Sequence, residues 1–322
     1  MIGRAAQLPD LSARADALRA RLAACDLCPH ACGANRRAGE TGRCRTGARA
    51  RIAAICDHHG EEPAISGTRG SGTVFAAGCT LRCVCCQNHQ ISQGHLADFP
   101  AYAAERLAED YLRLQAMGCH NVNWVSPTHA LPSLVRALAL AVDDGFRLPV
   151  VYNTHGYDSV DALRLLDGVV DIYLPDMKYA DADVALRLSG APDYPDRAIA
   201  AIREMYRQVG LLALDEDGVA VSGVIVRHLV LPGGLAGTRA ALRRLAEEVS
   251  PRLTISLMAQ YYPAHRAARM PELARSLTAA EYDDALDAFD EAGLEDGWRQ
   301  ELQAEATYRP DFADAGHPFA GR

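Results

Sequence analysis

Long apolar runs and a secretory leader are both missing from this 322-residue chain. No stretch approaches the roughly 18 consecutive apolar residues of a membrane-spanning helix. From Met1 to Cys25 the sequence alternates Arg with Leu and Ala, which is unlike the apolar core of a signal peptide. We therefore expect a cytoplasmic protein with no membrane partner.

A surplus of basic residues is missing as well. The chain has 33 Lys and Arg against 41 Asp and Glu, which gives a net charge of -8. Proteins that bind nucleic acid over a broad surface usually carry positive charge there, so no nucleic-acid partner is predicted. Small molecules or other proteins are the expected partners.

Cysteine, in contrast, is abundant. Without an export signal the ten cysteines are hard to explain as disulfides, because cytosolic thiols are kept reduced. Nine of them lie between Cys25 and Cys86, and only Cys119 lies outside this segment. The distribution favours metal or iron-sulfur ligation in the first third of the chain.

The order of apolar and amphipathic segments predicts a parallel α/β fold. A helix is expected from Leu11 to Ala24. Strands are expected within residues 73–77, 121–126, 148–153, 170–176, 223–232 and 253–260, and helices within 102–118, 131–145, 158–168, 238–250 and 278–293. Six strand-helix alternations fit a partial, six-unit TIM-like barrel better than a closed eightfold barrel, and a doubly wound sheet is the alternative. The predicted parts are an N-terminal helix with a Cys-rich metal-binding extension (1–70), the barrel (71–270) and a C-terminal helical tail (271–322).

Cys79, Cys83 and Cys86 have the spacing CxxxCxxC directly after the first predicted strand. A loop can wrap three thiolates around a 4Fe-4S cluster, whereas a zinc ribbon normally uses two separated CxxC pairs. Three protein ligands leave the fourth iron open to a reactant. Cys85 allows a second register, Cys79-Cys83-Cys85, although CxxC suits neighbouring cluster corners better than CxC, and we expect Cys85 to pack as a small apolar side chain. A structural zinc site and unliganded buried thiols are the alternatives.

A second set of thiols, Cys25, Cys28, Cys32 and Cys44, lies in a Gly- and Arg-rich loop. Four cysteines there could close a tetrahedral zinc site or hold an auxiliary iron-sulfur cluster. The residues leave zinc and iron-sulfur both open, with a slight preference for zinc. Unliganded thiols are the remaining alternative.

Polar residues follow the predicted strands, which is where parallel α/β folds place their sites. Asp176 and Lys178 are two residues apart at a strand end and therefore share a face. A carboxylate beside an ammonium suits recognition of an amino acid, and an ordinary surface ion pair is the alternative. Arg227 and His228 are adjacent in a strand, so they cannot both face the same side. His155 is given no proton-transfer role, because a lone His at a strand end is as often structural.

These motifs resemble those of the radical S-adenosylmethionine superfamily, in particular its branch of pyruvate formate-lyase activating enzyme-like proteins. The resemblance extends from about Cys25 to Gln300 and rests on GCTLRCVCCQN, CDLCPHACGANRRAGETGRC, HHGEEPAISGTRGSG, VYNTHGYDSVDALRLLDGVVDIYLPDMKY, IREMYRQVG, VRHLVLPGG and ISLMAQYYPAH. It implies a 4Fe-4S cluster on Cys79, Cys83 and Cys86, whose open iron binds the amino and carboxylate groups of S-adenosylmethionine. Reductive cleavage would give methionine and a 5'-deoxyadenosyl radical, which abstracts hydrogen from a protein, peptide or small-molecule substrate.

The resemblance also implies which residues bind the cofactor. Asp176 and Lys178 match a DxK element, and Arg227 matches a residue that binds the cofactor carboxylate. Thr128 lies where many relatives carry a Gly-Gly-Glu run that binds the cofactor amine, and Gln260 is expected on the rim of the site. The full predicted set is Thr128, Asn153, Thr154, Asp176, Lys178, Arg227 and Gln260. The stretch HHGEEP, residues 58–63, is left without a role.

The implied partners are a reductant such as flavodoxin or ferredoxin and, in activating enzymes, a glycyl-radical enzyme. Such activating enzymes often carry further ferredoxin-like cysteines after the first motif, and their absence here counts against this assignment. A non-catalytic iron-sulfur or zinc protein for electron transfer or assembly is the alternative function. Such a protein would need neither an open iron site nor polar residues after every strand.

Overall fold

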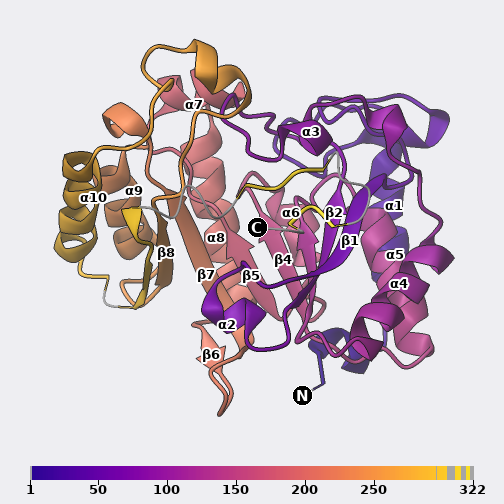
Figure 1. Ribbon diagram of the computed structural model, residues 1–322. Coiled ribbons are helices and arrows are strands. Elements are labelled where there is room, and N and C mark those ends of the chain that lie inside the picture. Colours follow the sequence, from indigo (N-terminus) through magenta and orange to yellow (C-terminus); the bar gives the residue numbers. More distant parts are fainter. Residues whose placement is uncertain (1, 295, 303–308, 313–316, 320–322) are drawn as a thin grey trace.

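A nine-stranded, mostly parallel sheet organises the computed structural model, which describes residues 2–294, 296–302, 309–312 and 317–319 (Figure 1). The strands lie in the order β1-β2-β3-β4-β5-β7-β8-β9, and β6 pairs with β7. The pairs β1-β2 and β6-β7 are antiparallel, and the other neighbouring strands are parallel. The strands are β1 (Ile52–His58), β2 (Ser71–Ala76), β3 (Val122–Val125), β4 (Val150–Thr154), β5 (Ile172–Pro175), β6 (Ala213–Leu214), β7 (Ala220–Leu229), β8 (Thr254–Met258) and β9 (Gly297–Arg299). The predicted α/β class is confirmed, and the six predicted strands are β2, β3, β4, β5, β7 and β8.

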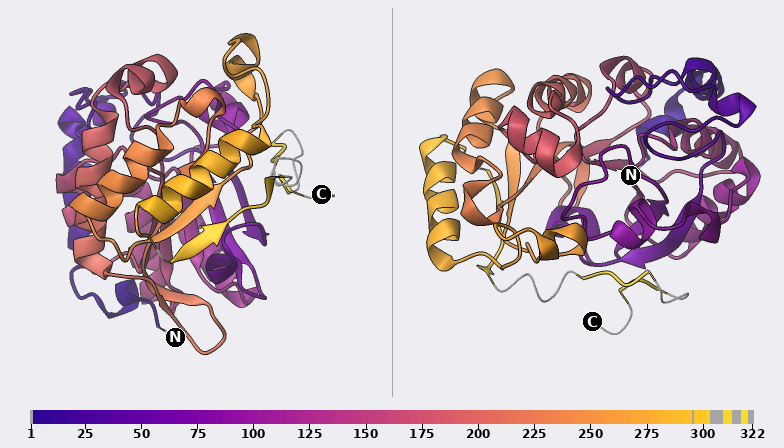
Figure 2. Two further views of the ribbon diagram at one scale, coloured as in Figure 1. Left: turned by 90° about the vertical axis from the view of Figure 1, so that its left-hand side faces the viewer. Right: turned by 90° about the horizontal axis from the view of Figure 1, so that it is seen from above.

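Helices supply the crossovers that parallel pairing requires. They are α1 (Leu11–Ala20), α2 (Pro63–Ser66), α3 (His89–Ser92), α4 (Ala104–Ala116), α5 (Leu131–Asp143), α6 (Val160–Arg164), α7 (Ala182–Ser189), α8 (Tyr194–Val209), α9 (Thr238–Glu248) and α10 (Ala279–Glu291). Helices α4 and α5 pack together beside the β1 end of the sheet, and α9 and α10 pack together beside β8 (Figures 1 and 2). In the part of the chain that the structure describes, no helix is long and apolar enough to cross a membrane.

The N-terminal helix is shorter than predicted. Its α-helical part ends at Ala20, and Arg21–Ala24 form a 3-10 turn, a common way for the last turn of a helix to tighten. The buried residues Leu11, Ala15 and Leu18 repeat at helical spacing, and α1 packs against α5. Cys25 follows the 3-10 turn directly, so the packing of this helix fixes where the Cys-rich loop begins.

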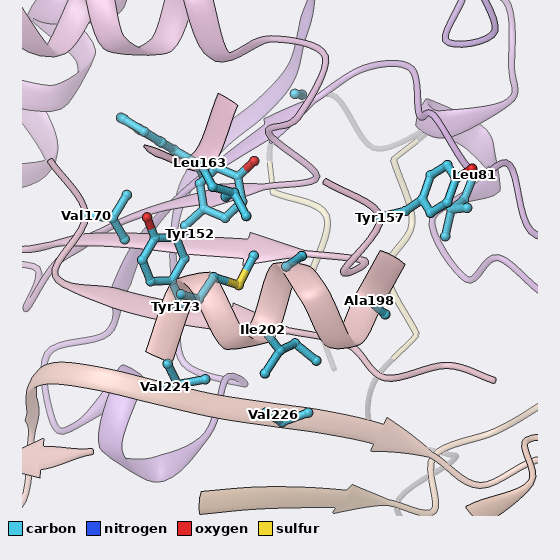
Figure 3. Packing of buried hydrophobic residues seen from close by; sticks show 14 of the residues in the cluster. Leu81, Tyr152, Tyr157, Leu163, Val170, Tyr173, Ala198, Ile202, Val224 and Val226 are labelled. Atoms are coloured by element: carbon cyan, nitrogen blue, oxygen red, sulfur yellow. The ribbon is translucent and has the colours of Figure 1, made fainter. Parts of the chain in front are cut away.

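Alternation along the strands gives the sheet two buried faces, as expected for parallel strands. On one face α8 packs against β5 and β7, and Figure 3 shows Tyr152, Tyr173, Val224 and Val226 around Ile202 of that helix. The intervening strand residues face the other side, where α2 packs on them; this smaller cluster contains Ala64, Ile65, Val151, Ile172, Leu174 and Ile225. The short helix α2 therefore holds the preceding loop against the inner face of the sheet.

The predicted set of strands is incomplete at both edges. β1 lies in the predicted extension but pairs along its length with β2. β9 lies within the predicted helical tail and pairs with β8; its three residues are too few to show a period in the sequence. The predicted boundary between the N-terminal extension and the barrel, at residues 70 and 71, separates β1 from β2, although these two strands pair with each other. This boundary stays a prediction. The polar end predicted from about Ala304 lies largely outside the described residues.

Candidate functional site

A cavity of about 440 Å³ lies where the parallel strands end. Its volume is typical of sites for cofactors and other small molecules. Apolar walls come from residues such as Phe75, Leu229 and Met258. Nine of the predicted site residues line it: Cys79, Cys83, Cys86, Asn153, Thr154, Asp176, Lys178, Arg227 and Gln260. Thr128 is not among the lining residues.

The loop after β2 carries the three cysteines Cys79, Cys83 and Cys86. Gly78 begins the loop with a φ of 95°, a conformation that favours glycine, and a Cβ there would meet the Cys44 carbonyl oxygen at 3.0 Å. The strand end and the Cys-rich extension thus approach each other so closely that only glycine fits between them.

Hydroxyl groups contact two of these thiols. The Ser189 hydroxyl donates to Cys83 Sγ at 3.0 Å, and the Ser92 Oγ lies 3.2 Å from Cys86 Sγ. Burial, with a smaller contribution from the neighbouring Cys83, raises the pKa of Cys79 and of Cys86 to about 12. Thiols in such a place need a bound cation to become thiolates.

In the described part of the chain, the three thiols do not converge on a single point. Across the described residues, no three His, Cys, Asp or Glu side chains are placed to hold one metal ion. Each thiolate of a 4Fe-4S cluster binds a different iron, so its cysteines need not converge on one point. Cys85 is half-buried against the main hydrophobic core but also lines the cavity. Both predicted registers therefore stay predictions.

Lys178 is the only lysine in the chain, and it lies in this cavity. Its Nζ is 2.6 Å from Oδ2 of Asp176, and the two side chains are 24% and 19% exposed. Burial lowers the pKa of Lys178, but the charge of Asp176 outweighs it, so the net pKa lies well above the usual value. The ammonium is therefore charged and has further donors for a ligand.

Arg227 is already paired within the cavity. Its Nε donates to Glu62 Oε1 at 2.7 Å, and its Nη2 donates to a carboxylate oxygen of both Glu61 and Glu62. The amide of Asn123 donates to Glu61 Oε1 at 3.0 Å, and that of Asn153 approaches the same oxygen at 3.4 Å. Two nearly buried carboxylates thus share one guanidinium, and this part of the cavity carries excess negative charge.

The pair Glu61-Glu62 gives the unassigned HHGEEP stretch a place in the site. Helix α2 begins directly after Glu62 and packs on the inner face of the sheet, which aims both carboxylates at β7. Burial raises the pKa of Glu62, but the charge and hydrogen bonds of Arg227 outweigh it and hold the pKa below its usual value. Sequence reasoning missed these contacts because they join residues about 165 positions apart.

Thr128 and Thr154 share one buried acceptor. Thr128 Oγ1 donates to Asp158 Oδ1 and Thr154 Oγ1 donates to Asp158 Oδ2, each at 2.6 Å, and the Tyr152 hydroxyl donates to Oδ1 at 2.8 Å. Thr128 is fully buried by this network. The structure therefore brings Thr154 to the cavity and holds Thr128 behind it.

The two histidines considered in the sequence are both buried and neutral. His155 Nδ1 accepts from the Tyr157 backbone N-H at 3.0 Å, which assigns the proton to Nε2, 2.8 Å from Thr80 Oγ1. Burial lowers the pKa of His155 to about 4 and likewise that of His228. His228 bonds to the Met177 carbonyl on the side away from the cavity, which confirms that it and Arg227 face opposite sides.

Residues near the C-terminus complete one wall of the cavity. Phe319 lines it and stacks on His58 with ring centroids 3.9 Å apart, and Phe312 packs edge-on against Phe75. Gln260, a predicted rim residue, accepts a hydrogen bond from Gln300 at 2.9 Å. Two isolated aromatic residues in a polar tail gave no signal of this contact in the sequence.

The second set of cysteines surrounds a cavity of its own. This small cavity, about 10 Å³, is lined by Cys25, Cys28, Cys32 and Cys44 together with Leu27, His30, Arg36, Arg43, Thr80 and His129. Cys25 and Cys44 are buried, Cys28 is half-buried and Cys32 is exposed. The structure therefore brings all four predicted ligands together.

Comparisons with known proteins identify a curated relative of this chain. The uncharacterized protein MJ0674 of Methanocaldococcus jannaschii is 31% identical over 278 residues, which cover 84% of this chain and 75% of that protein. No protein-family model matches the chain. Among solved structures, HydG, a maturase of the FeFe-hydrogenase, superposes with a TM-score of 0.46 at 13% identity. That match covers 74% of this chain, which spans about half (54%) of the HydG chain.

Proposed function

The chain belongs to the family of the uncharacterized protein MJ0674, and we propose that it is a radical S-adenosylmethionine enzyme. The observation that carries the proposal is the meeting of Cys79, Cys83 and Cys86 with a half-buried lysine-aspartate pair in one cavity of about 440 Å³. The resemblance of the cysteine loop and of the segments after the later strands to that superfamily supports it. A partial six-unit barrel, open along one side, is the corresponding architecture.

The three thiols would hold a 4Fe-4S cluster with one open iron. When bound, the cluster and S-adenosylmethionine together supply reductive cleavage to methionine and a 5'-deoxyadenosyl radical, and the protein's part is to bind, orient and exclude water. Phe75, Leu229 and Met258 form apolar walls that suit this last task. Hydrogen abstraction would then act on a protein, peptide or small-molecule substrate.

Lys178 and Asp176 are our candidates for the amino-acid end of the cofactor. An ammonium has three donors, so Lys178 can keep its bond to Asp176 and bind a carboxylate as well. The second oxygen of Asp176 can accept from the cofactor amine. Asn153 adds an amide from the neighbouring strand end, and Thr154 also lines the cavity there, although its hydroxyl proton is donated to Asp158 and the oxygen can only accept from a ligand.

Arg227 is a weaker candidate for the cofactor carboxylate than the sequence predicts. Its Nε and Nη2 already donate hydrogen bonds to Glu61 and Glu62. A ligand carboxylate at this point would meet two carboxylates against one guanidinium, which is unfavourable. We propose instead that Arg227 neutralises part of the charge of the two glutamates.

Anaerobic reconstitution with iron and sulfide, reduction with dithionite and chromatography for 5'-deoxyadenosine test the proposed function. We expect product from the wild type and from Cys119→Ala, a matched buried cysteine outside both cavities, but none from Cys83→Ala. Cys85→Ala should keep activity if Cys86 is the third ligand. Equal product from Cys83→Ala, or none from the wild type, would overturn the proposal and favour a non-catalytic electron-transfer or assembly role.

The partners follow from the same proposal. A low-potential protein such as flavodoxin or ferredoxin would reduce the cluster. Activation of a glycyl-radical enzyme is one form that the substrate step could take, and an electron paramagnetic resonance search for a protein glycyl radical tests it. The zinc or iron-sulfur identity of the second cysteine set is a separate question.

A further inference from the structure

Five arginines lie in or beside the cysteine loop, residues 77–88 between β2 and α3, which carries Cys79, Cys83 and Cys86. They come from three separate segments of the chain, and we call them the arginine patch: Arg43, Arg45, Arg82, Arg266 and Arg269. Arg45 and Arg82 are half-buried, and the other three are exposed. None of the five lines the cavity of about 440 Å³. The patch therefore lies outside that cavity, beside the cysteine loop.

Contacts with backbone carbonyls hold the patch against this loop. Arg266 Nη2 donates to the Arg82 carbonyl at 3.0 Å, and Arg43 Nη2 approaches the Leu81 carbonyl at 3.5 Å. The backbone N-H of Ala267 donates to a further carbonyl of the loop at 3.1 Å. Segments from the two ends of the chain therefore meet on the cysteine loop and bring their arginines together there.

The charges of the patch are not neutralised within the fold. In the part of the chain that the structure describes, no patch arginine forms an ion pair with a carboxylate. Glu272, the acidic residue nearest to Arg269 in the sequence, pairs with Arg187 instead, at 3.3 Å. The whole chain has a net charge of -8, so five unpaired positive charges in one place are a local exception. A patch of one sign attracts a partner of the opposite sign.

Two of the guanidinium groups also lack acceptors. Among the described residues, none accepts a hydrogen bond from the Nε of Arg45 or from the Nε of Arg82. A guanidinium has five N-H donors and no acceptor, so the missing partner of each is an acceptor, such as a carboxylate oxygen. The structure thus presents donors whose partners the described part of the fold does not supply.

The backbone at the same two positions is in a conformation that favours glycine. Arg45 has a φ of 60° and Arg82 a φ of 57°. This left-handed region is uncommon for residues other than Gly, Asn and Asp, and such residues cluster at functional sites. Arginine at these two turns is therefore explained by its charge rather than by the backbone.

We propose that the arginine patch docks a small acidic electron-transfer protein, which reduces the cluster on Cys79, Cys83 and Cys86. The identity of this partner rests on the proposed function, whereas the charge of the patch does not. In the step itself the donor loses one electron and the cluster gains it, and no bond forms or breaks. A donor on the patch lies against the loop that holds the thiols and leaves the cavity free, so donor and substrate can be bound together.

A compact acidic protein fits the patch better than a nucleic acid does. The phosphates of a nucleic acid are evenly spaced along an extended chain, and each needs a nearby cation for tight binding. Beyond the five arginines such a chain would continue over the surface of a protein with a net charge of -8. A small protein with its acidic residues on one face can confine its contacts to the patch.

Calorimetric binding of two probes, an acidic flavodoxin and an acidic 2Fe-2S ferredoxin, tests the patch without reference to catalysis. The full-length, anaerobically reconstituted chain would be titrated at about 0.1 M salt, where charges act over about 10 Å and only those near the interface count. Arg266→Glu/Arg269→Glu reverses two exposed charges and should weaken binding at least about tenfold, because like charges then face each other. Arg269→Glu alone, whose side chain donates no hydrogen bond to a described residue, should weaken it at least about threefold.

Arg243→Glu/Arg252→Glu is the matched control. Both arginines are exposed, and in the described structure neither forms an ion pair. Arg252 directly precedes β8 and so lies at the end of the sheet opposite the cavity. This double variant should change the affinity less than about twofold, because screening removes distant charges. Equal affinities of the patch and control variants, or no binding of either probe to the wild type, would overturn the proposal.

Stopped-flow measurement of cluster reduction then links the patch to electron transfer. Flavodoxin hydroquinone should reduce the Arg266→Glu/Arg269→Glu variant at least about tenfold more slowly than the wild type, because electrostatic steering is lost. Photoreduced 5-deazariboflavin, which is small and uncharged, should reduce both at rates within about twofold of each other. A short RNA duplex that displaces the flavodoxin from the patch would overturn the proposal in favour of a nucleic-acid partner. Charge-dependent binding with no 5'-deoxyadenosine from the wild type would refute the proposed function alone, and product with charge-independent binding would refute the docking surface alone.

Discussion

Replacing Arg227 by Met should reveal how strongly the cavity depends on charge neutralisation. The change removes the guanidinium that Glu61 and Glu62 share, while a side chain of similar length remains. The two carboxylates are only 8% and 5% exposed, so water replaces little of what is lost. Removing one partner of a buried ion pair typically costs about 3 to 5 kcal/mol. With a urea slope of about 3 kcal/mol per M, the unfolding midpoint should fall by roughly 1 to 1.7 M.

Urea titration followed by circular dichroism under anaerobic conditions measures this loss. The triple variant Arg227→Met/Glu61→Gln/Glu62→Gln removes all three charges and should recover most of the stability, because no unpaired charge stays buried. Arg239→Met is the matched control, since Arg239 is 47% exposed and pairs with surface carboxylates; it should cost less than about 1 kcal/mol. A single variant within 1 kcal/mol of the wild type, or a triple variant no better than the single one, would refute the reasoning.

The same variant has a pH signature. Burial raises the pKa of Glu62, yet Arg227 outweighs it and keeps the folded value below the usual 4.5. A carboxyl with a lowered folded pKa stabilises the fold above its unfolded pKa and loses that contribution as the pH falls through the folded pKa. The wild type should therefore lose this stabilisation only below about pH 4.5. In Arg227→Met burial acts unopposed, the pKa rises, and the stability deficit should shrink as the pH falls from 7 toward 5; a pH-independent deficit would contradict this.

Two further predictions concern neighbouring parts of the cavity. Lys178 is the only lysine, so lysine acylation read by mass spectrometry reports on this residue alone, and we expect it to be slow. Asp176→Asn should speed the labelling of Lys178 at least tenfold, because it removes the charge that raises the pKa of the ammonium; an unchanged rate would show that Asp176 does not hold it. Thr128→Val should cost about 1 to 2 kcal/mol of stability, since Asp158 loses a donor, and should leave the affinity for S-adenosylmethionine unchanged in equilibrium dialysis. Thr154→Val should lower the stability by a similar amount and should also weaken the affinity for S-adenosylmethionine. If both variants weaken this affinity equally, Thr128 contributes to the site and the distinction drawn here is wrong.

The fold was predictable where a local period repeats over enough residues. The six parallel strands carry continuous apolar runs, and each is followed by an amphipathic helix, so pattern alone identifies them. β1 is a short, largely apolar run in the sequence, and only its pairing with β2 in the folded chain shows that it belongs to the sheet. β9 has three residues, two of them at least partly polar or small, and could be found only through its partner β8.

The site was predictable where the residues are close in sequence. Asp176 and Lys178, two apart on one strand, form the expected pair. The assignment of Arg227 considered its own strand and could not include Glu61 and Glu62, which lie on the loop between β1 and α2, about 165 positions earlier in the chain. Thr128 has a hydroxyl in the segment where the sequence predicts a cofactor contact. In the fold, however, this hydroxyl donates to the buried carboxylate of Asp158 and does not line the cavity.

The composition itself points to Lys178 as an unusual residue. The chain carries 33 Lys and Arg, of which Lys178 is the only lysine. All the others are arginines. The presence of lysine at position 178 therefore calls for an explanation in the properties of its side chain. A compact ammonium occupies less of a confined cavity than a planar guanidinium and directs its donors by rotation rather than in a fixed fork. Next to Asp176 and a cluster of thiols, that freedom lets one cation hold its carboxylate partner and still turn a donor toward a ligand. Lys178→Arg should therefore impair ligand binding although the charge is kept, whereas Arg-to-Lys changes at exposed positions such as Arg239 should be tolerated.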